Sequence, residues 1–124
     1  MRVLVVDDFA TMRKIIKNVL KQINIDNTVE AENGKQALQT LKNDSVDLII
    51  SDWIMPEMTG IEFLRACKED PVIKNIPFIM VTAEAQKDSV VEAIKGGVDN
   101  YVVKPFTPEK LQAAIEKARA RVAQ

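Results

Sequence analysis

The sequence contains no histidine and a single cysteine, Cys67, among its 124 residues. The lack of histidine excludes Ser-His-Asp and Cys-His catalysis and removes the usual ligands of zinc sites. One cysteine cannot form an intrachain disulfide, which fits a reducing compartment and predicts a cytoplasmic protein. Any chemistry must therefore use carboxylates, hydroxyls, lysines or a hard metal ion.

Long apolar runs and an excess of one charge are also missing. No run approaches the ~20 residues that span a bilayer, since Asp7 and Asp8 interrupt the first apolar segment. We therefore expect neither a membrane protein nor a cleaved secretory precursor. The 17 basic and 18 acidic side chains give a net charge of −1, which provides no electrostatic basis for nucleic-acid binding.

The remaining composition is that of an ordinary soluble domain. Hydrophobic residues make up 47% of the chain and charged residues 28%, and a chain of this length can build one core. Because no linker or low-complexity tract divides the sequence, we expect residues 1–124 to form a single domain.

Short apolar segments alternate with helical patterns along the whole chain. Val3–Val6 is apolar and mostly β-branched, which is typical of a strand buried on both faces of a parallel sheet. Further strands are predicted at 28–32, a less buried edge segment, and at 48–50, 78–81 and 101–103. Each strand precedes a helical pattern, so the sequence predicts an α/β, doubly wound (βα)5 fold with helices on both faces of a five-stranded parallel sheet.

Apolar residues at helical spacing predict the helices. The first helix is indicated by Met12, Ile15, Ile16, Val19, Leu20 and Ile23. The residues expected to point inward are Val90, Val91 and Ile94 on the fourth helix and Leu111, Ala114, Ile115 and Ala118 on the last. Gly96–Gly97 predicts the C-cap of the fourth helix, and Thr107 the N-cap of the last. Cys67 is expected to be a core residue.

Polar residues stand where the predicted strands end. Asp7 and Asp8 follow the first strand, Asp52 the third, Thr82 the fourth and Lys104 the fifth. The carboxyl ends of parallel strands meet at one edge of the sheet, where ligands of open α/β folds bind. We therefore expect these five side chains to converge.

The expected cluster has an excess of negative charge. Two carboxylates at ~4 Å repel by roughly 1 kcal/mol in water and about 4 kcal/mol near a protein surface. Lys104 offsets one charge, and a divalent cation would offset more. Carboxylate and carbonyl oxygens with room for waters favour Mg²⁺, so the sequence predicts an acidic magnesium site.

These groups are those that phosphoryl transfer to a carboxylate requires. Asp52 stands alone on a central strand and is the better nucleophile, whereas the adjacent Asp7 and Asp8 suit metal binding. The metal and Lys104 would offset charge on the phosphoryl oxygens, and Thr82 would donate a hydrogen bond to one of them.

The motifs resemble those of the receiver domain of two-component response regulators. The matching residues are Val-Asp-Asp at 6–8, Ser-Asp-Trp at 51–53, Met-Pro at 55–56, Gly60, Val-Thr-Ala at 81–83 and Tyr-Val-Val-Lys-Pro-Phe at 101–106. Within that family, residues 7–15, Trp53 and Glu84 are similar to the single-domain chemotaxis regulators. The resemblance covers the whole chain and implies a flavodoxin-like sheet of strand order 2-1-3-4-5.

The resemblance also implies roles for individual residues. Asp52 would accept a phosphoryl group from the phosphohistidine of a histidine kinase. Asp8 would bind Mg²⁺ directly, Asp7 through water, and Asp52 and the carbonyl of Ile54 would complete the protein ligands.

Around the phosphoryl group, the resemblance implies contacts from the side chains of Thr82 and Lys104 and from the main chain of Trp53 and Ala83. It further implies a cis peptide bond between Lys104 and Pro105.

The output implied by the resemblance is a change of conformation at Thr82 and Tyr101. This change would control a protein partner, in chemotaxis the flagellar motor switch, at a surface of the fourth helix, fifth strand and last helix. Such a protein is expected to be a monomer and no enzyme beyond assisting its own phosphorylation and dephosphorylation. Ile54 departs from the chemotaxis pattern, which has asparagine there, so the lifetime of the phosphorylated state is expected to differ.

Three other functions are alternatives to this interpretation. The chain could be the receiver of a larger or non-chemotaxis regulator. A magnesium-dependent aspartyl-phosphate phosphatase needs an acid two residues after its nucleophile, and those positions hold Ala10 and Ile54. A flavin or dinucleotide carrier needs a glycine-rich phosphate loop, and residues 7–13 contain no glycine.

Overall fold

The computed structural model describes residues 1–122, in which five strands and five helices alternate. The strands are β1 (Val3–Val6), β2 (Thr28–Ala31), β3 (Leu48–Ser51), β4 (Phe78–Thr82) and β5 (Asn100–Val103). The helices are α1 (Ala10–Gln22), α2 (Gly34–Asn43), α3 (Gly60–Glu69), α4 (Lys87–Lys95) and α5 (Pro108–Val122). Within residues 1–122, no helix is both long and apolar enough to cross a bilayer.

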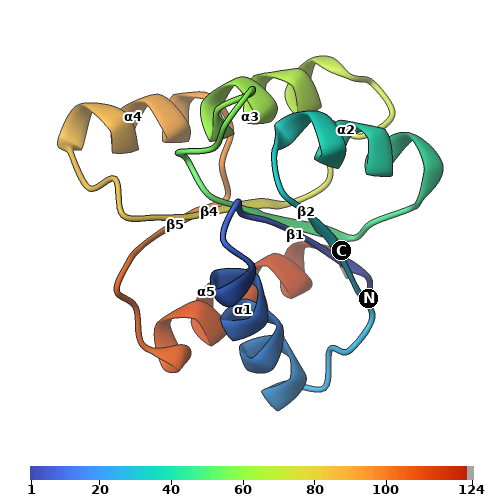
Figure 1. Cartoon of the computed structure of the whole chain (residues 1–124), viewed down its shortest axis with the longest axis vertical. Helices are drawn as coiled ribbons and strands as arrows, with labels where there is room; N and C mark the ends of the chain where they lie inside the picture. Colours follow the sequence, from blue (N-terminus) through green and yellow to red (C-terminus); the bar gives the residue numbers. More distant parts are fainter. Residues whose placement is uncertain (123–124) are drawn as a thin grey trace.

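All neighbouring strands pair in parallel, in the order β2-β1-β3-β4-β5. Helices α2, α3 and α4 cover one face of the sheet, and α1 and α5 cover the other (Figure 1). The predicted doubly wound, flavodoxin-like fold is therefore confirmed. The strand order reverses between β1 and β3, where Val6 pairs with Ser51, so these two strands end side by side.

The sheet separates two apolar layers. Alternate side chains of β1 point to opposite faces: Val3 and Val5 pack with α1 and α5, whereas Leu4 and Val6 pack with α2 and α3. A strand covered on both faces needs apolar side chains in both directions. This requirement explains the uninterrupted apolar run at Val3–Val6 that made the first strand predictable.

The predicted inward face of α4 is wrong. On α4, Val91 is 38% exposed and Ile94 60%, and the buried residue is Ala93 instead. Helical spacing shows that apolar residues share a stripe, but the small Ala93 permits the closer approach to the sheet. On α1, Ile15 is exposed, because the helix packs through Ile16 and through Val19 and Leu20 one turn further along.

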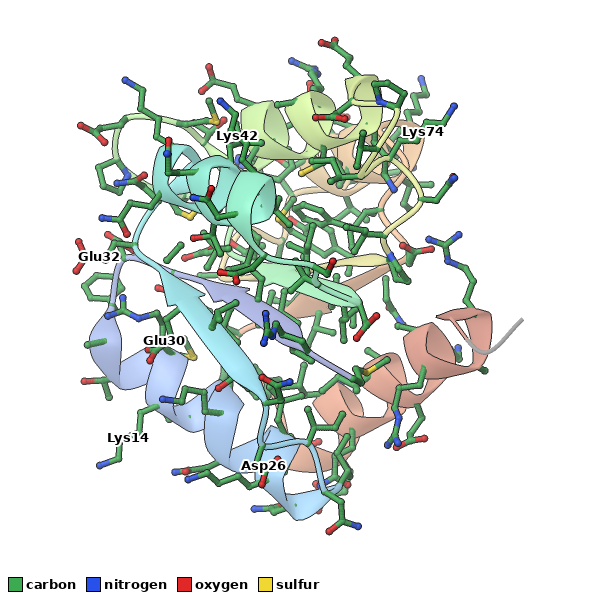
Figure 2. All side chains as sticks on the ribbon, turned by 90° about the vertical axis from the view of Figure 1, so that its right-hand side faces the viewer. Lys14, Asp26, Glu30, Glu32, Lys42 and Lys74 are labelled. Carbon is green, nitrogen blue, oxygen red and sulfur yellow. The ribbon has the colours of Figure 1, made fainter. Side chains whose placement is uncertain are left out.

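Edges, caps and outer surfaces follow the sequence pattern more closely. The strand β2 lies at one edge of the sheet, and Figure 2 views the molecule from that side, with charged side chains such as Lys42 and Lys74 on its periphery. Gly97 has a φ of +102° just after α4. The hydroxyl of Thr107 accepts a hydrogen bond from the N–H of Lys110, as an N-cap does. Cys67 is buried in the core.

Candidate functional site

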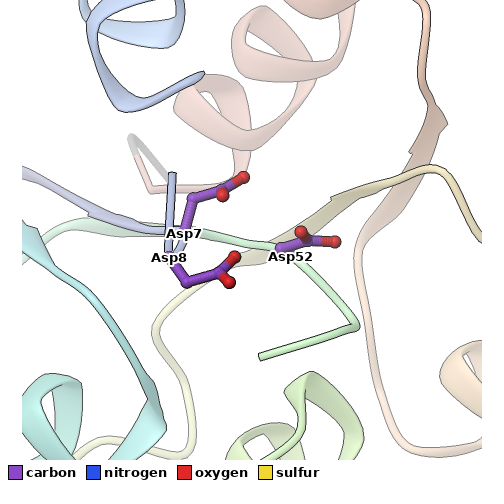
Figure 3. Close-up of side chains that lie close together, drawn as sticks. All are labelled: Asp7, Asp8 and Asp52. Carbon is purple, nitrogen blue, oxygen red and sulfur yellow. The ribbon is translucent and has the colours of Figure 1, made fainter. Parts of the chain in front are cut away.

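Three carboxylates meet at the carboxyl ends of β1 and β3. Asp7 and Asp8 follow β1, Asp52 follows β3, and one oxygen of each side chain lies within 4.8 Å of the others (Figure 3). Their proximity follows from the parallel pairing of the two strands, which ends at Val6 and Ser51. The sheet thus brings together side chains that are about 45 residues apart along the chain.

These carboxylates differ in exposure. Asp7 is only 1% exposed and Asp52 7%, whereas Asp8 lies on the surface. Burial raises the pKa of Asp7, and a hydrogen bond from the N–H of Phe9 and the neighbouring Lys104 ammonium oppose that rise. The buried pair therefore depends on nearby positive charge and hydrogen-bond donors.

Lys104 supplies positive charge from the end of β5. Its Nζ lies 2.9 Å from Oδ2 of Asp7 and 3.3 Å from Oδ2 of Asp52. One ammonium group is thus shared by both buried carboxylates, and its side chain is mostly buried with them. The peptide bond between Lys104 and Pro105 is cis.

The second oxygen of Asp52 is held by the main chain. Oδ1 accepts hydrogen bonds from the N–H of Trp53 at 2.7 Å and, more weakly, from that of Ile54 at 3.4 Å. The side chain of Trp53 is half-buried, and that of Ile54 is 61% exposed beside the acidic cluster. An apolar side chain therefore stands at the mouth of the site.

A tight loop between β3 and α3 packs against the main chain of Asp52. The N–H of Gly60 donates to the carbonyl of Trp53 at 2.6 Å, where the loop meets the start of α3. A Cβ at Gly60 would lie 2.1 Å from the carbonyl oxygen of Asp52, so only glycine fits. This close approach explains why the chain carries glycine at a helix N-terminus.

Thr82 and Tyr101 lie on the adjoining strands. Thr82 is fully buried, and its Oγ1 accepts a hydrogen bond from the N–H of Glu84, two residues beyond the end of β4. The hydroxyl of Tyr101 donates to the carbonyl of Glu84 at 2.6 Å. Burial, reinforced by the Glu84 carboxylate, raises the pKa of Tyr101 to about 12, so this hydroxyl keeps its proton near neutral pH. Ala83, between the two hydrogen-bonded positions, is exposed.

One residue of the site was not identified from the sequence. Nη1 of Arg13, on α1, donates to the main-chain carbonyl of Asp7 at 2.7 Å. An arginine on an amphipathic helix is expected to be solvated, and nothing in its spacing along the sequence indicates a partner at the end of β1. Only the packing of α1 beside β1 and β2 reveals the contact.

The donor set fits a hard divalent cation. Three carboxylates supply oxygen ligands, two of them buried, and one lysine leaves their combined charge negative. Oxygen donors of this kind select Mg²⁺ or Ca²⁺ over softer metals. An exposed Asp8 beside the buried pair also leaves one side of the cluster open to solvent.

Known proteins are similar to this chain in both sequence and architecture. The family model of the response regulator receiver domain matches residues 3–116. The chemotaxis protein CheY of Pseudomonas aeruginosa is 50% identical over 122 residues, which cover 98% of each chain. Among solved structures, the chemotaxis response regulator CheY4 of Vibrio cholerae superposes with a TM-score of 0.86 at 32% identity, covering 94% of this chain and 97% of that one.

A second solved structure comes from a different context. The signal receiver domain of a histidine kinase from Syntrophus aciditrophicus has a TM-score of 0.88 at 30% identity and covers 96% of this chain and 89% of that one. The family match, the relatives and the shared fold agree with the acidic cluster at the strand ends. The chain therefore belongs to the response regulator receiver domain family.

Proposed function

We propose that this chain is a phosphoacceptor signalling protein in which Asp52 receives a phosphoryl group from the phosphohistidine of a histidine kinase. The observation that carries the proposal is the cluster of Asp7, Asp8 and Asp52 with Lys104 shared between the two buried members. The names of the relatives, which are chemotaxis proteins, support a role in a chemotaxis phosphorelay.

In the proposed reaction, a carboxylate oxygen of Asp52 attacks phosphorus in line with the bond to the histidine nitrogen. The new P–O bond forms as the P–N bond breaks, and the imidazole leaves with the electron pair. Asp7, Asp8, Asp52 and the carbonyl of Ile54 would hold an Mg²⁺ ion, which when bound supplies positive charge against the phosphoryl oxygens.

The other polar groups receive roles from their positions. Lys104, already within 3.3 Å of Asp52, would move from carboxylate to phosphoryl oxygen. The hydroxyl of Thr82 would donate a hydrogen bond to one phosphoryl oxygen, and the main-chain N–H groups of Trp53 and Ala83 would donate to others. The N–H of Trp53 already points at Asp52, so its role needs little rearrangement.

Phosphorylation would act on the protein surface through Thr82 and Tyr101. A shift of Thr82 toward the phosphoryl group disturbs its hydrogen bond with Glu84, whose carbonyl holds the Tyr101 hydroxyl. The two rotamers of Tyr101 would then distinguish the inactive and active states, whose balance the added charge changes.

The proposed partner surface lies beside that tyrosine. The exposed apolar residues Val91 and Ile94 of α4 and Val103 of β5 border it. A hollow of about 350 Å³ between β5 and α5 continues it and is lined by residues that include Tyr101 and Lys117. We propose this α4-β5-α5 surface as the site for the output partner, the flagellar motor switch, in a cytoplasmic, monomeric protein whose residues 1–124 form one domain without an enzymatic output.

Intact mass spectrometry after incubation with acetyl phosphate and Mg²⁺ tests the central claim. The parent protein should gain one phosphoryl group, and both Asp52→Ala and an excess of chelator should prevent the gain. Asp26→Asn, which alters an exposed aspartate far from the site, is the matched control and should be phosphorylated like the parent. A folded parent that gains no mass under these conditions would refute the proposal.

The magnesium-dependent phosphatase remains the alternative from another class. Its leaving-group acid would stand at Ile54, whose exposed side chain has no proton to give. A receiver in a larger phosphorelay protein has more support, because the Syntrophus aciditrophicus structure is a receiver domain of a histidine kinase. Binding of the phosphorylated protein to a purified motor switch protein separates these outputs.

A further inference from the structure

We propose that Arg13 is a positioning residue of the acidic site, which sets the directions of the Asp7 and Asp8 carboxylates for cation binding. The inference rests on the proposed function, in which these carboxylates hold Mg²⁺. It goes further because it assigns a role to a side chain of α1 that reaches the site only through the main-chain carbonyl of Asp7.

The contact between Arg13 and Asp7 lies just beyond the last sheet hydrogen bonds of β1. The last ladder bonds of β1 run from the N–H of Asp7 to Ala31 and from the N–H of Asp52 to the carbonyl of Val6. The carbonyl of Asp7 lies beyond them, and it accepts a hydrogen bond of 2.7 Å from Nη1 of Arg13. Arg13 thus binds the first carbonyl after β1 that is not hydrogen-bonded within the sheet.

Holding this carbonyl restrains the main chain from which both acidic side chains project. The peptide group between Asp7 and Asp8 is planar, so its orientation sets ψ of the first residue and φ of the second. The carboxylate of Asp7 is held further by the N–H of Phe9 and by Lys104. Asp8 is exposed, and the main chain sets the position and direction of the Cα–Cβ bond from which its carboxylate reaches the cation.

Arg13 is itself held in place. Its Nε donates to Oε1 of Glu30 at 2.9 Å, and Lys17 lies 3.0 Å from the other oxygen of that carboxylate. These hydrogen bonds, chiefly that from Lys17, lower the pKa of Glu30, which keeps it charged near neutral pH. Glu30 lies on β2 on the side facing α1 (Figure 2), so the edge strand anchors the arginine from outside.

The two contacts use different nitrogens of the arginine. Its guanidinium carries several N–H donors in a rigid plane, so Nε can bind Glu30 while Nη1 binds the carbonyl of Asp7. A lysine keeps the charge, but its donors all lie on one nitrogen, which cannot occupy the separate positions of Nε and Nη1. Arg13→Lys therefore separates the charge of the residue from its geometry.

Charge and positioning make opposite predictions for cation binding. A positive charge close to a cation site repels the cation, so removal of that charge alone should tighten binding. Loss of a group that orients the ligands should weaken binding, by about tenfold for typical supporting residues of metal sites. The sign of the change therefore identifies the role.

The test is a Mg²⁺ titration of purified protein without a phosphodonor, monitored by the fluorescence of Trp53. This residue is the single tryptophan of the chain, and its main-chain N–H donates to Asp52. We expect Arg13→Met and Arg13→Lys both to raise the Kd for Mg²⁺ by about tenfold. Thermal unfolding of each variant is measured in parallel, since a merely structural role would lower the unfolding temperature without changing the Kd of the folded protein.

Two exposed lysines of α1 are matched controls. Lys14 is exposed on the turn that carries Arg13, and Lys21 is exposed in the last turn of the same helix. Lys14→Met and Lys21→Met should both leave the Kd within about twofold of the parent value, because neither lysine belongs to the chain of contacts from Glu30 through Arg13 to Asp7. If Arg13→Met does not fold, Arg13→Lys, which keeps the apolar stem and the charge, carries the same test.

The outcomes separate this inference from the proposed function. A parent that binds Mg²⁺ while Arg13→Met and Arg13→Lys bind it equally well or more tightly overturns the positioning role alone. A parent whose fluorescence and stability do not respond to Mg²⁺ overturns both. Weaker binding in the two arginine variants, with unchanged binding in the two lysine controls, supports both.

Discussion

Asp7 carries a charge in a nearly buried position beside two other carboxylates. Its pKa lies above the ordinary value of 3.8, chiefly because burial disfavours the ionised form. A group whose pKa rises on folding reduces stability as the pH increases through its folded pKa. The ligand set that suits a cation is therefore a source of instability when no cation is bound.

The neutral variant Asp7→Asn should be more stable than the parent at pH 7 without divalent cations, by on the order of 1 kcal/mol. An amide can still accept the hydrogen bond from the N–H of Phe9, so the turn should survive. The gain should shrink as the pH falls toward 3.8, where the carboxyl group is protonated in the unfolded chain too. Urea unfolding at pH 4 and pH 7 in chelator measures both effects; a loss of stability at pH 7 would contradict the prediction.

Gly60 offers a test of close packing against the acceptor. Because an added Cβ would lie 2.1 Å from the carbonyl of Asp52, Gly60→Ala should destabilise the protein by more than about 2 kcal/mol. Gly34→Ala is the comparison: its Cβ would lie 2.8 Å from Cγ and Sδ of Met58, which can rotate away, so this substitution should cost less than Gly60→Ala, whose Cβ meets main-chain atoms. Chemical unfolding of both variants gives the comparison, and equal effects would argue against a rigid loop.

Ile54 should influence how long the acyl phosphate survives. Its exposed apolar side chain stands at the mouth of the site, where an asparagine could hydrogen-bond an attacking water. We expect Ile54→Asn to lose its phosphoryl group severalfold faster than the parent, whereas the apolar control Ile54→Leu should decay at the parent rate. Decay of the phosphorylated mass after removal of acetyl phosphate measures the rates. Equal decay rates for Ile54→Asn and the parent would contradict the prediction.

At the scale of single elements, α4 is where sequence and structure differ most. The spacing of Val90, Val91 and Ile94 correctly predicts a helix with an apolar stripe. It does not reveal whether the stripe covers the sheet or faces solvent, because that choice depends on neighbours that are remote in sequence. Gly96 lies close to Leu64 of α3, and this approach contributes to the orientation of the helix.

The orientation of α4 predicts unequal effects of the same substitution at adjacent positions. Ile94→Gln should change the free energy of unfolding by less than about 0.5 kcal/mol, since the side chain is already mostly in water. Ala93→Gln should cost more than about 2 kcal/mol, because a large polar group would have to enter a fully buried position. Thermal or urea unfolding of the two variants decides; a large loss at Ile94 would restore the orientation predicted from the spacing.

At the scale of the whole molecule, cation binding and folding should be linked. A ligand that binds only the folded state stabilises it by about 2.7 kcal/mol at a concentration one hundred times its Kd. We therefore expect Mg²⁺ to raise the unfolding temperature and chelator to reverse the rise. Asp8→Asn should abolish the response, and because Asp8 is exposed the change should leave the core intact. A parent whose unfolding temperature is the same with Mg²⁺ and with chelator would contradict the linkage.

The sequence predicted the whole-molecule architecture well, for a physical reason. Apolar strands covered on both faces differ sharply in composition from amphipathic helices, so the alternation of the two is visible residue by residue. The converging polar groups followed, because parallel strands end at a common edge. Arg13 and the outward face of α4 were not predictable, since each depends on how elements pack against one another.

The ion pair between Lys104 and Asp7 joins residues 97 positions apart. During synthesis, at roughly 5–20 residues per second, the first three strands emerge well before the strand that ends at this lysine. Until β5 has left the ribosome and paired with β4, the two buried carboxylates lack their shared ammonium group. If Asp52 accepts a phosphoryl group as proposed, we expect a nascent chain to become an acceptor only after β5 has paired with β4.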